Sequence, residues 1–141
     1  MTLVLRAEVS SAPLDVAEHA RLVGHDSAGA VVTFAGVVRD HDGGRTVREL
    51  EYSAHPSAAD VLMIVATEVA KRADRVRGLA VSHRVGRLVV GDVALACAVS
   101  ADHRREAFVV CAELVDELKH RLPIWKRQLF ADGTTEWVNC P

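Results

Sequence analysis

The stretch Val93-Ala-Leu-Ala-Cys-Ala-Val99 alternates bulky residues with alanine. Successive side chains of a β-strand point to opposite faces, so one face of this stretch is bulky and the other consists of alanine alone. A strand that is apolar on both faces is typical of a sheet covered on both sides. The stretch therefore predicts a buried strand whose alanine face is approached closely by a helix or a second sheet.

The clearest helix follows this strand, over residues 105–120. Pro123 ends it, because proline disfavours the helical conformation of the residue before it. The predicted buried stripe of this helix comprises Phe108, Cys111, Leu114, Val115 and Leu118. Two more helices are predicted, over residues 13–22, with a proline near the start, and over residues 56–73.

Further strands are predicted from apolar runs and turn residues. Residues 29–38 are apolar on both faces and predict a central, buried strand, with residues 47–54 as a plausible partner strand. Two hairpins are expected, one around Gly86-Arg87 and a terminal one around Asp132-Gly133. The remaining ranges are a strand over 3–9, hairpin strands over 78–85 and 88–90, and hairpin strands over 129–130 and 134–138. This order predicts a single α+β domain, residues 1–141, with mostly antiparallel strand pairing.

Composition limits the class of protein. The net charge is −2 and the pI is near 6.4, which argues against a general nucleic-acid or anionic-membrane binder, because both need a broad basic face. The slightly positive mean hydropathy hints at apolar surface buried against another subunit. No signal peptide or membrane-spanning stretch is recognisable, so we expect a cytoplasmic protein.

Two of the three lysines, Lys119 and Lys126, flank a Pro-Ile-Trp bend in the segment Lys119-His-Arg-Leu-Pro-Ile-Trp-Lys-Arg-Gln128. Arginine outnumbers lysine 14 to 3, so plain surface charge is supplied by arginine. An amine can lose its proton and act as a nucleophile or an acid–base group, whereas a guanidinium cannot. The pair therefore indicates functional lysines, against the alternative that both are solvated surface residues.

Basic residues also gather where other predicted elements end. Arg39 follows the strand over 29–38, and His103-Arg104-Arg105 opens the clearest helix, where free N–H groups and the helix dipole favour an anion. The alternative is that the arginines are solvated and His103 merely caps the helix. From the residues alone, the sequence predicts a site for a small anionic molecule with one or two functional lysines, and no reaction type follows.

The cysteines and histidines form no metal-binding motif, so we expect no metal and no cofactor. Cys97 and Cys111 fall at predicted core positions. Cys140 is the remaining candidate for persulfide chemistry, although no neighbouring cation would lower its pKa. Histidines 19, 25, 41, 55 and 120 are interpreted as solvated or loop residues.

An ordered set of motifs, from about residue 29 to 138, resembles the molybdopterin synthase catalytic (large) subunit family. The motifs are Phe34-Ala-Gly-Val-Val-Arg39, Leu50-Glu-Tyr52, His83-Arg-Val-Gly-Arg-Leu88 with Gly91-Asp92, His103-Arg104 with Ala107-Phe108, Pro123-Ile-Trp-Lys126, and Asp132-Gly133 with Trp137-Val138. Each motif is weak alone, and the order in which they occur is specific.

The resemblance implies an α/β hammerhead-like domain with an additional antiparallel β-sheet. It implies sulfur transfer from the C-terminal Gly-Gly thiocarboxylate of a small ubiquitin-like carrier protein to cyclic pyranopterin monophosphate, forming the dithiolene of molybdopterin in molybdenum cofactor biosynthesis. It also implies a homodimer within a heterotetramer that contains two carriers. By the same resemblance, Lys119 and Lys126 are catalytic, and the substrate-binding residues are Val37, Val38, Arg39, His103, Arg104, Arg127 and Gln128.

The chain departs from the family pattern at a few positions. Gln128 stands where an acidic residue is common, Ser53 and His55 replace the more usual Glu and Tyr, and the sequence ends soon after Val138. Two alternatives remain open at this point: a non-catalytic subunit that only binds the carrier, and a sulfurtransferase that depends on Cys140.

Overall fold

The computed structural model describes residues 2–139, within which nine strands and three helices form two sheets and their covering layers. The elements are β1 (Leu3–Ser10), α1 (Val16–Leu22), β2 (Ala30–Val37), β3 (His41–Asp42), β4 (Arg45–Ala54), α2 (Ala58–Arg72), β5 (Val76–Arg84), β6 (Gly86–Val89), β7 (Val93–Ala101), α3 (Arg104–Arg121), β8 (Ile124–Phe130) and β9 (Thr135–Asn139).

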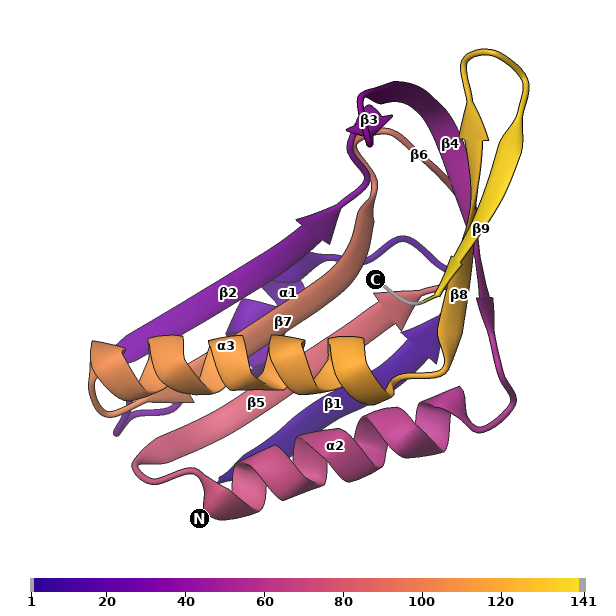
Figure 1. Cartoon of the computed structure of the whole chain (residues 1–141). Coiled ribbons are helices and arrows are strands. Elements are labelled where there is room, and N and C mark those ends of the chain that lie inside the picture. The colour runs from indigo at the N-terminus through magenta and orange to yellow at the C-terminus, as the bar shows by residue number, and fades with distance from the viewer. Residues whose placement is uncertain (1, 140–141) are drawn as a thin grey trace.

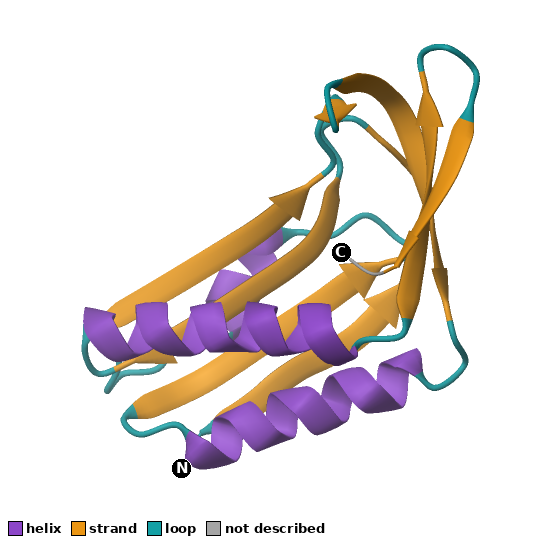
Figure 2. Ribbon diagram, viewed as in Figure 1, coloured by secondary structure: helices purple, strands orange, loops and turns teal. Residues whose placement is uncertain are grey.

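The first sheet has the strand order β1-β5-β7-β2, in which β1 and β5 are parallel and the other pairs antiparallel. Helices α2 and α3 cover one face, and the short helix α1 covers the other (Figures 1 and 2). The face of β7 toward α2 and α3 carries Leu95, Cys97 and Val99, which belong to the main core. Ala98, on the opposite face, packs with residues at the end of α1. The prediction from the alanine face, a closely approaching helix, is confirmed.

The second sheet has the order β3-β4-β8-β9, with β6 paired to β4 as well. It is curved and stands beyond the ends of β1, β2 and β5 (Figure 1). Strand β8 starts at Ile124, immediately after Pro123, so the predicted bend is a short connection from α3 into a strand. The terminal hairpin is confirmed, with Gly133 at a φ of 87° in its turn. The α+β fold with an additional sheet is therefore confirmed.

Three sequence-based predictions about strand partners are wrong. Strand β2 lies at the edge of its sheet and is not central, and Val31 and Val37 on its second face are 47% and 51% exposed. Strand β4 does not pair with β2, because it belongs to the second sheet. No hairpin forms at Gly86, whose φ of 94° instead redirects the chain from β5 in the first sheet to β6 in the second. A glycine with positive φ permits a reversal of the chain but does not select its strand partner.

Three local predictions also differ from the structure. Helix α1 begins at Val16, because the side chain of Asp15 caps it by accepting a hydrogen bond from the backbone N–H of Glu18. Phe108 is 61% exposed and does not belong to the buried stripe of α3. His19 is buried, and Nε2 lies 2.7 Å from Ser82 Oγ. A hydrogen-bonding partner on a distant strand makes this burial tolerable.

Candidate functional site

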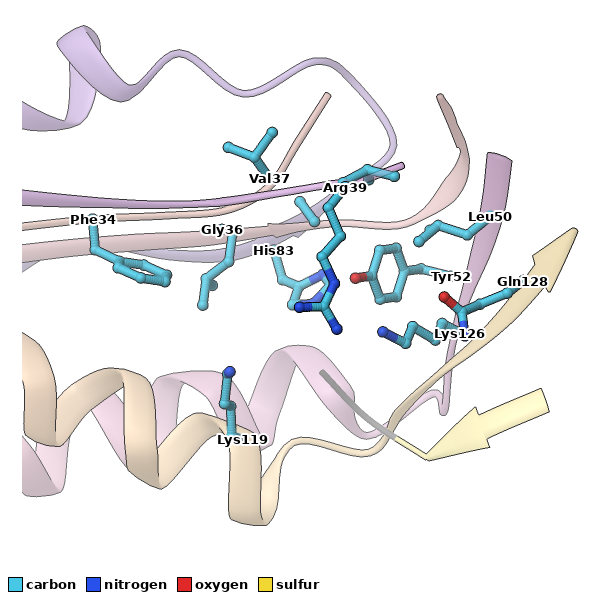
Figure 3. Close-up of a pocket in the computed structure, with 13 residues that line it drawn as sticks. Phe34, Gly36, Val37, Arg39, Leu50, Tyr52, His83, Lys119, Lys126 and Gln128 are labelled. Carbon is cyan, nitrogen blue, oxygen red and sulfur yellow. The ribbon is translucent and has the colours of Figure 1, made fainter. Parts of the chain in front are cut away.

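A cavity of about 280 Å³ lies where the two sheets and the end of α3 meet. Figure 3 shows the side chains that project toward it from these elements. The lining residues are Phe34, Gly36 and Val37 from β2, Val38 and Arg39 after it, Leu50 and Tyr52 from β4, His83 from β5, Ala94 and Leu95 from β7, Lys119 from α3, and Lys126 and Gln128 from β8. The cavity thus combines several cationic groups with an apolar wall.

The two lysines converge on this cavity from either side of Pro123, as the sequence predicts. Lys119 belongs to the last turn of α3, where basic residues favourably meet the negative end of the helix dipole. The helix ends at Arg121, the C-cap residue Leu122 has an extended backbone, and β8 begins two residues after Leu122. Lys119 is nevertheless exposed, whereas Lys126 is half-buried.

Strand periodicity separates Arg127 from its two neighbours. Because side chains alternate along β8, Lys126 and Gln128 face the cavity and Arg127 points to the other face of the sheet. There Arg127 Nη2 lies 3.9 Å from Glu51 Oε1, and its guanidinium stands over the Trp137 ring. The structure therefore does not bring Arg127 to the cavity that contains the lysines.

Asp42 connects Arg39, which follows β2, to Gln128 on β8. The sequence did not identify Asp42 as a site residue. Arg39 donates to Asp42 Oδ1 at 3.2 Å, and Gln128 Nε2 donates to Asp42 Oδ2 at 2.7 Å. The hydrogen bond from Gln128, with the nearby charges of Lys126 and Arg39, lowers the pKa of Asp42 below its usual value. The only signal in the sequence was a pair of aspartates, Asp40 and Asp42, inside a loop that begins and ends with arginine.

His103 and Arg104 lie at the opposite end of α3 from the lysines. Lys119 follows Arg104 by 15 residues along this helix, which corresponds to about 22 Å at a 1.5 Å rise per residue. Both residues line a separate surface hollow with Arg105, Glu106 and Phe108. Within one chain, the structure does not bring them to the cavity that contains Arg39.

His83 and Tyr52 form a buried polar part of the cavity wall that sequence reasoning also missed as a site. Their rings meet edge to face, with centroids 4.9 Å apart. His83 is 1% exposed, and burial lowers its pKa to about 4, so the imidazole is neutral at pH 7. The available signal for this position was a histidine that closely follows the apolar run Leu79-Ala-Val81.

The cysteines that the structure describes are unsuited to nucleophilic chemistry. Cys97 and Cys111 are buried free thiols, and burial raises the pKa of Cys97 well above its usual value and that of Cys111 to about 11. Cys140 lies outside the described residues.

No group of three or more possible metal-binding side chains occurs within residues 2–139. Within the same range, every helix is too short or too polar to cross a membrane.

The arrangement favours an anionic small molecule. Arg39, Lys119 and Lys126 bring positive charge to the cavity, while Val38, Leu50 and Leu95 exclude water from one side of it. Asp42 offsets only part of this charge. Such a site can bind a phosphate or carboxylate group and can place an amine beside a reacting carbon.

Comparisons with known proteins point to one family. The family model described as "MoaE protein" matches residues 9–121. A relative from Nostoc, named molybdopterin synthase catalytic subunit, is 37% identical over 132 residues, covering 93% of this chain and 80% of the relative. The crystal structure of molybdopterin synthase from Staphylococcus aureus superimposes with a TM-score of 0.87 at 28% identity, covering 94% of this chain and 96% of that one.

A more distant structure shares the fold. It is titled a protein–protein complex of subunits 1 and 2 of molybdopterin-converting factor from Helicobacter pylori. The match has a TM-score of 0.68 at 18% identity and covers 98% of this chain and 88% of that one.

Proposed function

This chain belongs to the MoaE protein family, and from that premise we propose that it is the catalytic subunit of a molybdopterin synthase. It transfers sulfur from the thiocarboxylated C-terminus of a small ubiquitin-like carrier protein to cyclic pyranopterin monophosphate, forming the dithiolene of molybdopterin. The observation that supports this function most directly is the convergence of Arg39, Lys119 and Lys126 on one cavity from three different segments.

The chemistry matches the residues that line the cavity. A thiocarboxylate is already a sulfur nucleophile, so the enzyme does not need a cysteine thiolate, and neither Cys97 nor Cys111 lines the cavity. What the reaction needs is positive charge for the phosphate and the carrier tail, together with an amine or acid near the carbon that receives sulfur. We assign Lys119 to that catalytic role and Lys126 to catalysis or to holding the anionic groups.

Substrate binding is assigned to the residues around the lysines. Arg39 would pair with the phosphate of the substrate, and Gln128 would maintain the position of Arg39 through their shared partner Asp42. Val37 and Val38 would contact the substrate from the end of β2. Arg127 remains a predicted binding residue, although its position opposite Glu51 favours a contact outside this cavity.

His103 and Arg104 can share a phosphate with Arg39 only if they come from a second copy of the chain, because about 22 Å of helix separates them from Lys119. The exposed apolar side chains of β2 and α3, such as Val31 and Phe108, support such a homodimer. With a carrier at each of the two cavities, the assembly is a heterotetramer.

Two broader features belong to the same proposal. Residues 1–141 are a single domain, which is supported by a core cluster that includes residues from both sheets. The compartment is the cytoplasm, which is supported by the two buried free thiols.

The proposed function is tested by supplying the purified protein with preformed thiocarboxylated carrier and cyclic pyranopterin monophosphate. We expect dithiolene formation that is retained in Cys140→Ser and Lys71→Ala, since Lys71 lies on α2 and does not line the cavity. Failure of the wild-type protein to form dithiolene would contradict the proposal. Loss of activity in Cys140→Ser alone would favour the cysteine-dependent alternative, and carrier binding without turnover would favour the non-catalytic subunit.

A further inference from the structure

One polar atom in the cavity wall has no partner within the described residues. His83 Nδ1 lies 2.7 Å from the backbone carbonyl oxygen of Arg84. A carbonyl oxygen can only accept a hydrogen bond, so Nδ1 donates and carries the ring proton. Nε2 is then an unprotonated acceptor, and it is a buried side-chain atom with no hydrogen bond to any described residue.

An unsatisfied buried acceptor is uncommon, because such a group has lost its hydrogen bonds to water without regaining them in the protein. The other fully buried histidine illustrates the usual arrangement. His19 uses Nδ1 for the carbonyl oxygen of Asp15 and Nε2 for Ser82 Oγ. His83 differs from His19 in lining the same cavity as Arg39 and Lys126, which suggests that the hydrogen-bond partner of Nε2 is a ligand (Figure 3).

The neighbouring side chains indicate which kind of ligand group this acceptor suits. Arg39, Lys119 and Lys126 can only donate hydrogen bonds, so they suit a phosphate. A reduced pterin ring carries N–H groups, which need an acceptor. Nε2 is buried, so a neighbouring side chain must move before this contact forms.

We propose that His83 is a substrate-binding residue whose Nε2 accepts a hydrogen bond from an N–H group of the pterin ring. The contact orients the ring relative to Lys119, while the cationic side chains hold the phosphate. This inference rests on the proposed function, because that function supplies the pterin. The T-shaped contact with Tyr52 and the hydrogen bond to Arg84 hold the imidazole in the required orientation.

The test measures binding of cyclic pyranopterin monophosphate and of inorganic phosphate by calorimetry. His83→Asn retains a donor near the Nδ1 position and removes the acceptor, so we expect substrate affinity to fall about tenfold and phosphate affinity to stay within about twofold of wild type. His83→Gln, which places an amide oxygen near the Nε2 position, should recover most of the substrate affinity. His19→Asn is the control for a buried histidine outside the cavity, and it should bind substrate normally.

Several results would overturn the inference. Wild-type substrate affinity in His83→Asn, or an equal loss of substrate and phosphate affinity without recovery in His83→Gln, would leave His83 with a structural role only. If His83→Asn does not fold, His83→Gln is compared with His83→Met, because the two side chains have similar length and only Gln carries an amide acceptor. Equal substrate affinity of these two variants would contradict the proposal. If the wild-type protein binds phosphate but not the pterin substrate, both the proposed function and this inference are wrong. If the wild-type protein turns over normally and the His83 variants bind substrate with wild-type affinity, only this inference is wrong.

Discussion

Gln128 donates a 2.7 Å hydrogen bond to Asp42, a residue 86 positions earlier in the chain. The other carboxylate oxygen of Asp42 accepts from Arg39. One carboxylate therefore connects the strand that bears Lys126 to the arginine on the opposite side of the cavity. Because Gln128 is 3% exposed, its amide has few alternative partners, so the contact constrains the geometry of the site.

An acidic residue at position 128 should be incompatible with Asp42 in this chain. Gln128→Glu would place two carboxylates within hydrogen-bonding distance, and we expect the free energy of unfolding at pH 7 to fall by about 1–3 kcal/mol. Repulsion raises the folded-state pKa of the two carboxyl groups above its unfolded value. The difference in the free energy of unfolding between Gln128→Glu and wild type should therefore shrink as the pH falls through that pKa. The exchanged pair Asp42→Asn with Gln128→Glu restores one donor and one acceptor and should regain stability in urea titrations. Equal stability of Gln128→Glu and wild type would contradict this account.

Lys119 should be irreplaceable by arginine. If its amine supplies a nucleophile or a proton, Lys119→Arg preserves the charge but loses the chemistry, and both Lys119→Arg and Lys119→Ala should lower dithiolene formation by at least about 100-fold. Lys119 is exposed, so we expect both melting temperatures to stay close to wild type. The assay uses preformed thiocarboxylated carrier, with Lys71→Ala as the matched control. Wild-type turnover in Lys119→Ala would refute the mechanism.

Lys126 should tolerate arginine better than Lys119 does. If it binds anionic groups, Lys126→Ala should lower kcat/KM about tenfold or more, and Lys126→Arg should retain most of the activity. Lys126 pairs across the sheet with Tyr52 and lies near Asp42, so thermal unfolding of each variant is needed as a control. An equal and severe loss in Lys126→Arg would instead indicate that the second amine takes part in the chemistry.

Two copies of the chain should be needed for one complete phosphate site. We expect Arg39→Ala and Arg104→Ala each to be poorly active alone. Co-expressed in equal amounts, they should recover about a quarter of wild-type activity, because half of the dimers are mixed and one of the two sites in each mixed dimer is intact. Sedimentation should show a dimer without carrier. Recovery no greater than the sum of the separate variants, or a monomer at micromolar concentration, would contradict shared sites.

His83 should make the protein less stable in mild acid. Its folded-state pKa of about 4 lies below the ordinary value of 6.5, so the unfolded chain binds the proton more readily between these values. Neutral His83 therefore contributes fully to the free energy of unfolding above pH 6.5. This contribution falls by about 3 kcal/mol in total as the pH falls toward 4. Urea titrations from pH 7 to 4.5 should therefore show a shallower loss of stability in His83→Gln than in wild type. Parallel pH profiles would show that His83 titrates normally.

Residues whose role depends on local conformation were predictable from the sequence. The spacing of Lys119 and Lys126 around Pro123 was sufficient to predict that they converge, because proline ends a helix in a known way and a short connection keeps its two arms together. Asp42 and His83 were not predicted as site residues, since their partners Gln128 and Tyr52 lie on strands brought beside them only by the fold.

Three local conformations follow directly from the amino-acid sequence: the two unlike faces of β7, the end of α3 before Pro123, and the turn at Gly133. Each depends on backbone geometry or side-chain size within a few residues. The pairing of β4 with β8, the edge position of β2 and the separation of His103 from the cavity that Arg39 lines depend instead on tertiary packing. Several segments of the chain have similar local patterns, and each is compatible with more than one strand partner. The packing of the whole chain selects which strands pair and which polar groups are buried.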